Sequence, residues 1–255
     1  MNGYQAFSEY YDRLMNDAEY PRRAEYLLSL FEQHGQRPQT LLDVACGSGS
    51  LCREFLRLGV DPIGVDGSAS MLAKAAEKLS GKALLLQQDM RELDLYGMAD
   101  GAVCTMDSVN HLCKTGDVAR FFSRLRLFVQ PGGLFIFDVN SVYKHREVLG
   151  NRVFVAEEPG VLCVWRNRLL SRTNEVEMLL DFFAEEPDGR YSRFCDTVRE
   201  RAYSQRVLRR LLNEAGWDCL AVYADLTTEQ PAPDCERWVF VSRNNRTVEQ
   251  AENGE

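Results

Sequence analysis

Hydrophobic and polar positions follow two different patterns along this chain of 255 residues. Between residues 40 and 140, short apolar runs alternate with segments whose apolar side chains recur every three or four positions, which predicts five strands separated by helices or turns. This alternation is typical of a doubly wound parallel sheet with helices on both faces. A helix is also predicted from Pro21 to His34, with Gly35 as its stop. Ser68 and Asp117 are expected to cap two later helices.

The pattern changes after residue 140. Residues 152–201 hold four strand-like runs separated by the turn sequences PG, SRTN and PDG, which predict an antiparallel meander. A helix at Ser204–Ala215 and strands near Trp217–Ala224 and Arg237–Arg243 follow. The predicted fold class is therefore α/β, a Rossmann-like, doubly wound, mostly parallel seven-stranded sheet with an inserted antiparallel β-meander.

The same patterns divide the chain into four parts. Residues 1–36 are an N-terminal arm and helix, residues 37–140 and 204–243 are the main domain, and residues 141–203 are the insertion. The polar residues 244–255 are expected to be a disordered tail. The insertion is expected to serve either as a lid over the site or as the contact of a homodimer.

Composition excludes some classes of protein and leaves an ordinary globular one, with 45% hydrophobic and 27% charged residues. A net charge of −8 disfavours nucleic acid as a partner, because recognition of a phosphate backbone needs a basic surface. The sequence shows no signal peptide and no apolar run of membrane-spanning length, so we expect a cytoplasmic protein without a membrane partner. Eight cysteines without a CxxC pair favour reduced, mostly buried thiols over disulfides or a metal site.

The most informative segment is Leu41–Ser50, LLDVACGSGS, in which a strand runs into a turn of small residues. Glycines in such a turn let the backbone approach a ligand closely. The next strand ends at Asp66, where an acid can accept hydrogen bonds from both hydroxyls of a ribose. Cys52 takes the place of the third glycine of a dinucleotide fingerprint, and Asp43 would repel a pyrophosphate but suits a cationic ligand. A nucleoside cofactor that is cationic or bears an amino acid is therefore predicted.

These residues resemble motif I of the class I S-adenosylmethionine (SAM) methyltransferases. Three later segments resemble further motifs of that family in the same order: Leu84–Leu93, Asp100–Leu112 and Gln130–Val139. The resemblance implies SAM as the cofactor, S-adenosylhomocysteine as its product, and a SAM-binding domain at 37–140 and 204–243. The cofactor-binding residues that it implies are Tyr10, Asp43, Ala45, Cys46, Gly47, Ser48, Gly49, Asp66, Gly67, Met71, Asp89, Met90, Asp107 and Ser108.

The stretch FSEYYDRL and the serine and histidine of DSVNHL resemble the small-molecule N-methyltransferases that dimethylate amino sugars, and the NHL loop also resembles glycine N-methyltransferase. The sequence departs from the sugar enzymes at Asp107 and Asn110. The resemblance implies Tyr11 and His111 as catalytic residues, with Tyr11 orienting an acceptor amine and His111 accepting its proton. The predicted function is methyl transfer to a small-molecule acceptor, for which an amine is favoured; the sequence leaves open which acceptor it is and whether nitrogen, oxygen or carbon is methylated.

Two other classes of function are compatible with parts of this pattern. A non-catalytic SAM-binding or assembly protein would share every cofactor residue, and a nicotinamide-dependent oxidoreductase would share the fold. Single residues also have structural alternatives. Asp43 could stabilise the turn, Asp89 could cap the turn that follows it, and His111 could be structural or bind the SAM carboxylate.

Overall fold

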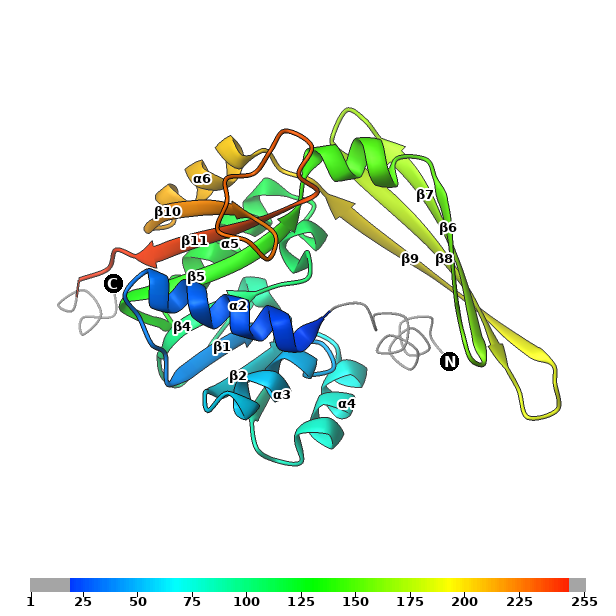
Figure 1. Ribbon diagram of the computed structural model, residues 1–255, viewed down its shortest axis with the longest axis horizontal. Helices are drawn as coiled ribbons and strands as arrows, with labels where there is room; N and C mark the ends of the chain where they lie inside the picture. The colour runs from blue at the N-terminus through cyan, green and yellow to red at the C-terminus, as the bar shows by residue number, and fades with distance from the viewer. Residues whose placement is uncertain (1–18, 248–255) are drawn as a thin grey trace.

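The computed structural model describes residues 19–247 (Figure 1). Seven strands form one sheet in the order β10-β11-β5-β4-β1-β2-β3. The parallel strands are β1 (Thr40–Val44), β2 (Asp61–Asp66), β3 (Leu84–Gln87), β4 (Ala99–Cys104) and β5 (Val129–Asn140). β11 (Arg237–Asn244) runs antiparallel to both β5 and β10 (Trp217–Ala224). This arrangement confirms the predicted fold class.

Helices cover both faces of this sheet. They are α2 (Tyr20–Gln33), α3 (Ser50–Arg57), α4 (Ala69–Leu79), α5 (Thr115–Arg126) and α6 (Gln205–Glu214). The chain also forms the short helices η2 (Met90–Glu92), η3 (Ser108–His111) and η4 (Lys144–Leu149), of which η4 packs on the second, four-stranded sheet. α2 and α3 pack on one face of the seven-stranded sheet, and α5 and α6 pack on the other. No helix in the described part of the chain combines the length and the apolar character that crossing a bilayer requires.

The helix boundaries follow the predicted signals with one exception. Gly35, in the left-handed region at φ +80°, follows the end of α2. The Ser68 hydroxyl accepts a hydrogen bond from the backbone N–H of Met71 and so caps α4. The prediction that Asp117 caps α5 is wrong, because Lys114 holds the cap position and Asp117 lies in the first turn. An acid there still interacts favourably with the positive end of the helix dipole.

Aromatic side chains fill the centre of the core between β5, β11 and α5. The rings of Phe137 and Phe240 stack with centroids 4.9 Å apart, and Phe135 meets Phe121 edge to face at 5.9 Å. Trp217, fully buried, donates a hydrogen bond from Nε1 to the carbonyl of Phe122 at 2.9 Å. Burial of large rings, together with their preferred pair geometries, contributes much of the stability of such a core. It fixes the antiparallel β10–β11 hairpin against the parallel strands.

The second sheet is the predicted meander, with its strands in the order β6-β7-β8-β9. Its bounds are β6 (Val153–Glu158), β7 (Val161–Leu170), β8 (Glu175–Glu185) and β9 (Tyr191–Arg201). It stands beside the main sheet rather than extending it (Figure 1). Its inner face carries an apolar cluster that includes Cys163, Met178, Leu180 and Phe182.

The last strand extends into the segment that the sequence assigns to the tail. Asn244 ends β11, pairs with Trp217 of β10 and is 1% exposed. Its amide donates a hydrogen bond to the carbonyl of Val129 at 2.8 Å. Polar side chains alone suggested a tail here, but this amide satisfies a buried carbonyl at the start of β5.

Gly101 should tolerate no side chain. A Cβ there would lie 2.5 Å from Cε1 of Phe31, which is fully buried. We expect Gly101→Ala to lower the free energy of unfolding by about 1–3 kcal/mol, as overpacking commonly does. Urea denaturation would measure this, with Gly97→Ala as the matched control because a Cβ at Gly97 meets nothing within 4 Å. Equal stability of the two variants would contradict the packing described here.

Candidate active site

The turn after β1 exposes its backbone to a cavity. Ala45 and Gly47 both adopt left-handed conformations, with φ of +60° and +56°. A Cβ added at Gly47 would meet nothing within 4 Å, so the backbone is open on that side. The N–H of Gly47 donates to Oδ2 of Asp66 at 2.8 Å, and the N–H of Ser68 donates to Oδ1 at 2.8 Å. The carboxylate at the end of β2 is thus fixed directly beside the turn.

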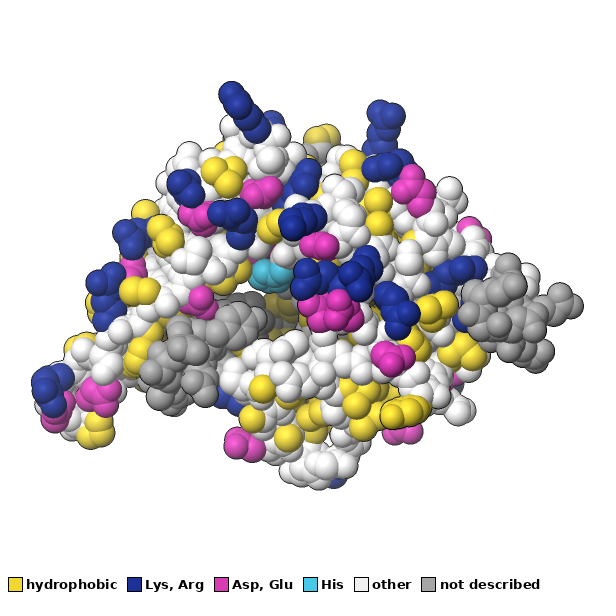
Figure 2. Space-filling model, turned by 180° about the vertical axis from the view of Figure 1, so that it is seen from behind, with side chains coloured by type: hydrophobic (Ala, Val, Ile, Leu, Met, Phe, Trp, Pro, Cys, Tyr) yellow, Lys and Arg dark blue, Asp and Glu magenta, His cyan; other side chains and the backbone are white. Residues whose placement is uncertain are grey.

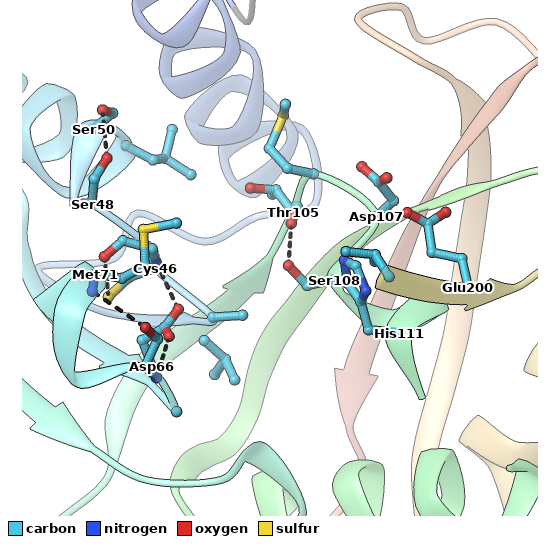
Figure 3. Close-up of a pocket in the computed structure, with 18 of the residues that line it drawn as sticks. Cys46, Ser48, Ser50, Asp66, Met71, Thr105, Asp107, Ser108, His111 and Glu200 are labelled. Atoms are coloured by element: carbon cyan, nitrogen blue, oxygen red, sulfur yellow. Dashed lines mark hydrogen bonds between the residues drawn. The ribbon is translucent and has the colours of Figure 1, made fainter. Parts of the chain in front are cut away.

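One cavity of about 740 Å³ extends from this turn to the inner face of the second sheet. Figure 3 shows Asp66 and Cys46 on one side of it and Asp107, His111 and Glu200 on the other. The predicted residues that line it are Asp43, Ala45, Cys46, Gly47, Ser48, Asp66, Gly67, Met71, Met90, Asp107, Ser108 and His111. Residues distant in sequence therefore share one site.

Two predicted cofactor residues lie elsewhere. Gly49 is not among the residues that line the cavity. A Cβ there would lie 3.0 Å from Cβ of Ala75, so this glycine permits close packing of the turn on α4. Asp89 lines a second cavity of about 480 Å³ that shares Met90 and His111 with the first. Its Oδ1 accepts a hydrogen bond from the backbone N–H of Arg91 at 2.9 Å, which caps η2. The structural alternative for Asp89 is thus present, and contact with adenine stays a prediction.

Tyr10 and Tyr11 lie outside the described residues. His111, in contrast, is exposed at the end of η3 and lines both cavities. A histidine side chain stands at the edge of a hollow on the face opposite that of Figure 1, among Lys, Arg and acidic side chains (Figure 2). The position of His111 is compatible with the proton-accepting role that the sequence predicts for it.

The sequence analysis predicted the insertion as a lid over the site and pointed to Trp165, but it did not identify the other side chains with which this sheet lines the cavity. The inner face of the second sheet contributes Ala156, Cys163, Trp165, Met178, Leu180, Phe182, Val198 and Glu200. Tyr20, Ser50, Gln88, Thr105 and Met106 also line the cavity. Alternation along β7–β9 could have identified two faces of the sheet, but nothing local shows which face meets the crevice.

Asp43 is a buried acid with a weak partner. It is 2% exposed, and the thiol of Cys52 lies 3.1 Å from its Oδ2 as a hydrogen-bond donor. Burial raises the pKa of Asp43 to about 7; the thiol lowers it somewhat, and the nearby Asp66 raises it further. A positively charged group in the cavity would supply the missing compensation.

Asp107 differs from Asp43 because it has strong partners. Its Oδ1 accepts a hydrogen bond from Arg237 at 3.0 Å, and its Oδ2 accepts one from Nδ2 of Asn140 at 2.8 Å. Burial raises the pKa of Asp107, but its electrostatic interactions with Arg237, His111 and Lys144 outweigh burial and hold this pKa below its ordinary value. Asp107 is therefore an ionised carboxylate at neutral pH.

The residues present fit SAM. The open backbone at Gly47 allows close approach, Asp66 ends β2 where ribose hydroxyls are bound in such sheets, and Asp43 suits a cation. Among residues 19–247, no group of three or more His, Cys, Asp or Glu side chains could hold a metal ion.

Loss of the Asp66 carboxylate should weaken the binding of SAM. We expect Asp66→Ala to cost about 1–3 kcal/mol of binding free energy, because a part-buried charged acceptor is lost. Calorimetry would measure this, with Asp61→Ala as the control because Asp61 is exposed at the start of the same strand. Asp66→Asn separates loss of charge from collapse of the turn. Unchanged affinity in both Asp66 variants would contradict the assignment.

The raised pKa of Asp43 predicts a pH dependence. Below pH 7 the carboxyl is largely protonated, and a cationic ligand favours its ionised form, so binding should release a proton. We expect the affinity for SAM to rise from pH 6 to 7, by at most about tenfold for one proton, and Asp43→Asn to abolish the rise. Calorimetry in buffers of different ionisation enthalpy would count the protons.

The same residue should affect the stability of the unliganded protein. The folded-state pKa of Asp43 is raised above 3.8, so its contribution to stability is lost as the pH rises through about 7. Asp43→Asn should therefore raise the Tm more at pH 8 than at pH 5.5. Equal shifts at both pH values would show that Asp43 does not titrate near neutral pH.

Comparison with known proteins identifies the family of this chain. Residues 41–133 match the family described as "Methyltransferase domain". A protein of Geobacillus sp. (strain WCH70), provisionally named a methyltransferase, is 33% identical over 244 residues, which cover 94% of this chain and 99% of that protein. A glycine/sarcosine N-methyltransferase of Parasynechococcus marenigrum (strain WH8102) is 31% identical over 234 residues, which cover 89% of this chain and 80% of that enzyme.

A solved structure extends the likeness to the whole fold. The crystal structure of a SAM-dependent methyltransferase from Clostridium acetobutylicum ATCC 824 superposes with a TM-score of 0.86 and 26% identity, over 96% of this chain and 100% of that one. The sequence relatives, the fold and the turn after β1 all indicate the same family. The chain belongs to the class I SAM-dependent methyltransferases.

Proposed function

We propose that this methyltransferase transfers the methyl group of SAM to the amine of a small molecule with an apolar body. The observation that carries the proposal is the lining of the cavity, which joins the turn after β1 to an apolar wall and to acidic side chains. A volume of about 740 Å³ lies within the usual range of small-molecule sites. Membership of the family leaves the nicotinamide-dependent oxidoreductase without support.

The apolar wall comes from the second sheet. Trp165, Leu180 and Phe182 line the cavity from β7 and β8. Burial of an apolar acceptor against them would be favourable, at roughly 25 cal/mol per Å² of apolar surface. This supports a role of the insertion as a lid over the acceptor, and a homodimer stays a prediction.

The acidic side chains favour an amine over an acid or a phenol. Asp107 and Glu200 both line the cavity, and both carboxylates are part-buried or buried. A second negative charge placed there would be repelled in a site with little water, whereas an ammonium group would be attracted. The glycine/sarcosine N-methyltransferase among the relatives is named for methyl transfer to nitrogen, which also supports the proposal.

For methyl transfer, the protein needs mainly to position the acceptor and to accept a proton from it. SAM supplies a methyl group that its sulfonium already activates. The cavity walls hold the acceptor in line with that methyl, and such alignment can contribute about 7–11 kcal/mol in favourable cases. His111 accepts the proton that an ammonium acceptor must lose, and Tyr11 of the N-terminal arm orients the amine.

A panel of acceptors tests the proposal. The protein would be incubated with radiolabelled SAM and with 2-phenylethylamine, ethanolamine, glycine, phenylacetic acid or 4-ethylphenol, and transfer of the label would be counted. We expect transfer to at least one amine and none to the acid or the phenol. Transfer to the acid or the phenol alone would overturn the amine. Binding of SAM without transfer to any compound would favour the non-catalytic SAM-binding protein.

A further inference from the structure

Glu200 stands out among the residues that line the cavity, because it is a buried acid supplied by the inserted sheet. It lies near the end of β9, is 4% exposed, and borders the cavity close to Asp107 and His111 (Figure 3). No motif in the sequence pointed to it. An acid so deeply buried is unusual unless it is paired or binds a ligand.

Both close polar contacts of this carboxylate with the described residues converge on one oxygen. Oε2 accepts a hydrogen bond from Nδ2 of Asn140 at 3.1 Å, and Nε2 of His145 lies 3.3 Å from the same oxygen. Within residues 19–247 the structure gives Oε1 no hydrogen-bond partner. One oxygen therefore anchors Glu200, and the other is available to a ligand in the cavity.

The anchor is itself held rigidly. The backbone N–H of Asn140 donates to Oδ1 of Asn110 at 2.9 Å, and Nδ2 of Asn110 donates to the carbonyls of Asn140 at 3.2 Å and Arg201 at 2.9 Å. Arg201 follows Glu200 directly in β9. These bonds fix the end of β9 against the end of β5, so the position of the Glu200 carboxylate does not depend on a ligand.

His145 lies against the same oxygen from the other side. It is fully buried, and its Nδ1 lies 3.0 Å from the carbonyl oxygen of Asn174. A carbonyl oxygen only accepts hydrogen bonds, so Nδ1 carries the hydrogen and Nε2 faces Glu200. In this structure Nε2 makes no hydrogen bond, and it would pair with Oε2 only as part of a protonated imidazole, so the hydrogen bond from Asn140 is the anchor of Glu200.

Asp107 is less suited than Glu200 to bind a cation, although it also lines the cavity. Both of its oxygens are engaged, one by the guanidinium of Arg237 and the other by Asn140. The charge of Arg237 already compensates it. The same amide nitrogen of Asn140 donates to Asp107 and to Glu200, so the two carboxylates are held at a fixed separation.

We propose that Glu200 recognises the acceptor, by accepting a hydrogen bond from its ammonium or amine group through Oε1. This role of Glu200 rests on the proposed function as an amine methyltransferase. It adds the residue that selects an amine over a neutral molecule of the same shape, such as the corresponding alcohol. The inserted sheet then supplies the counter-charge for the acceptor as well as the apolar wall, and His111 remains the proton acceptor.

The test compares an amine with a neutral molecule of the same shape. The KM for 2-phenylethylamine and the inhibition constant of 2-phenylethanol against it would be measured for the parent, for Glu200→Gln and for Glu185→Gln. Glutamine keeps the shape of the side chain and an oxygen that can accept from Asn140. Glu185 is exposed at the end of β8 and serves as the matched control.

We expect Glu200→Gln to raise the KM for the amine by about 10- to 100-fold, as loss of a charged hydrogen-bond partner commonly does. Binding of 2-phenylethanol and of SAM should change less than about threefold, because the apolar wall and the cofactor turn are intact. Glu185→Gln should behave as the parent.

Other outcomes overturn the proposal in distinguishable ways. Equal weakening of the amine and the alcohol in Glu200→Gln, or a fall in SAM affinity, would show that Glu200 only supports the structure. An unchanged KM would show that it does not contact the acceptor. If the parent methylates none of the amines, the proposed function itself fails, and the role of Glu200 fails with it.

Discussion

The end of the fold that holds the cavity depends on one buried carboxylate, Asp138 of β5. It is 1% exposed, and its oxygens accept hydrogen bonds from the backbone N–H groups of Met106 and Asp107 at 2.9 and 2.8 Å. Both of these residues adopt left-handed conformations at φ +57°, which cost about 1–2 kcal/mol each for L-amino acids. The two hydrogen bonds to Asp138 stabilise the loop after β4 in this shape.

The positive charge of Arg237 in β11 compensates the buried negative charge of Asp138. Arg237 forms an ion pair with Asp138 and donates a hydrogen bond to Asp107. Burial lowers the pKa of Arg237, but Asp138, Asp107 and Asp225 outweigh burial and raise it, so the guanidinium stays charged. Removal of one member of such a group leaves an uncompensated buried charge, which is strongly destabilising. The ends of β4, β5 and β11 are therefore positioned as one unit.

Asn140, two residues beyond Asp138, connects that unit to the inserted sheet. Its amide donates to Asp107 on the main domain and to Glu200 on β9. The meander is thus fixed to the main sheet by buried polar contacts at one end, while its apolar inner face closes the cavity. The main sheet and the inserted sheet therefore meet at one fixed point beside the cavity, and a cavity with fixed walls suits a reaction that depends on alignment.

The sequence by itself determined the order of strands and helices, the chemistry of the turn after β1, and the acid at the end of β2. These features are local, since strand and helix periodicities and turn residues act over a few positions, and the carboxyl ends of parallel strands necessarily meet at one edge. Gly49 shows the limit, because a glycine that serves close packing has the same signature as one that approaches a ligand. Only the tertiary structure decided which face of the meander meets the crevice and which acids are paired. Glu200 reaches Asn140 across 60 residues, and Arg237 reaches Asp107 across 130, and no local pattern encodes such contacts.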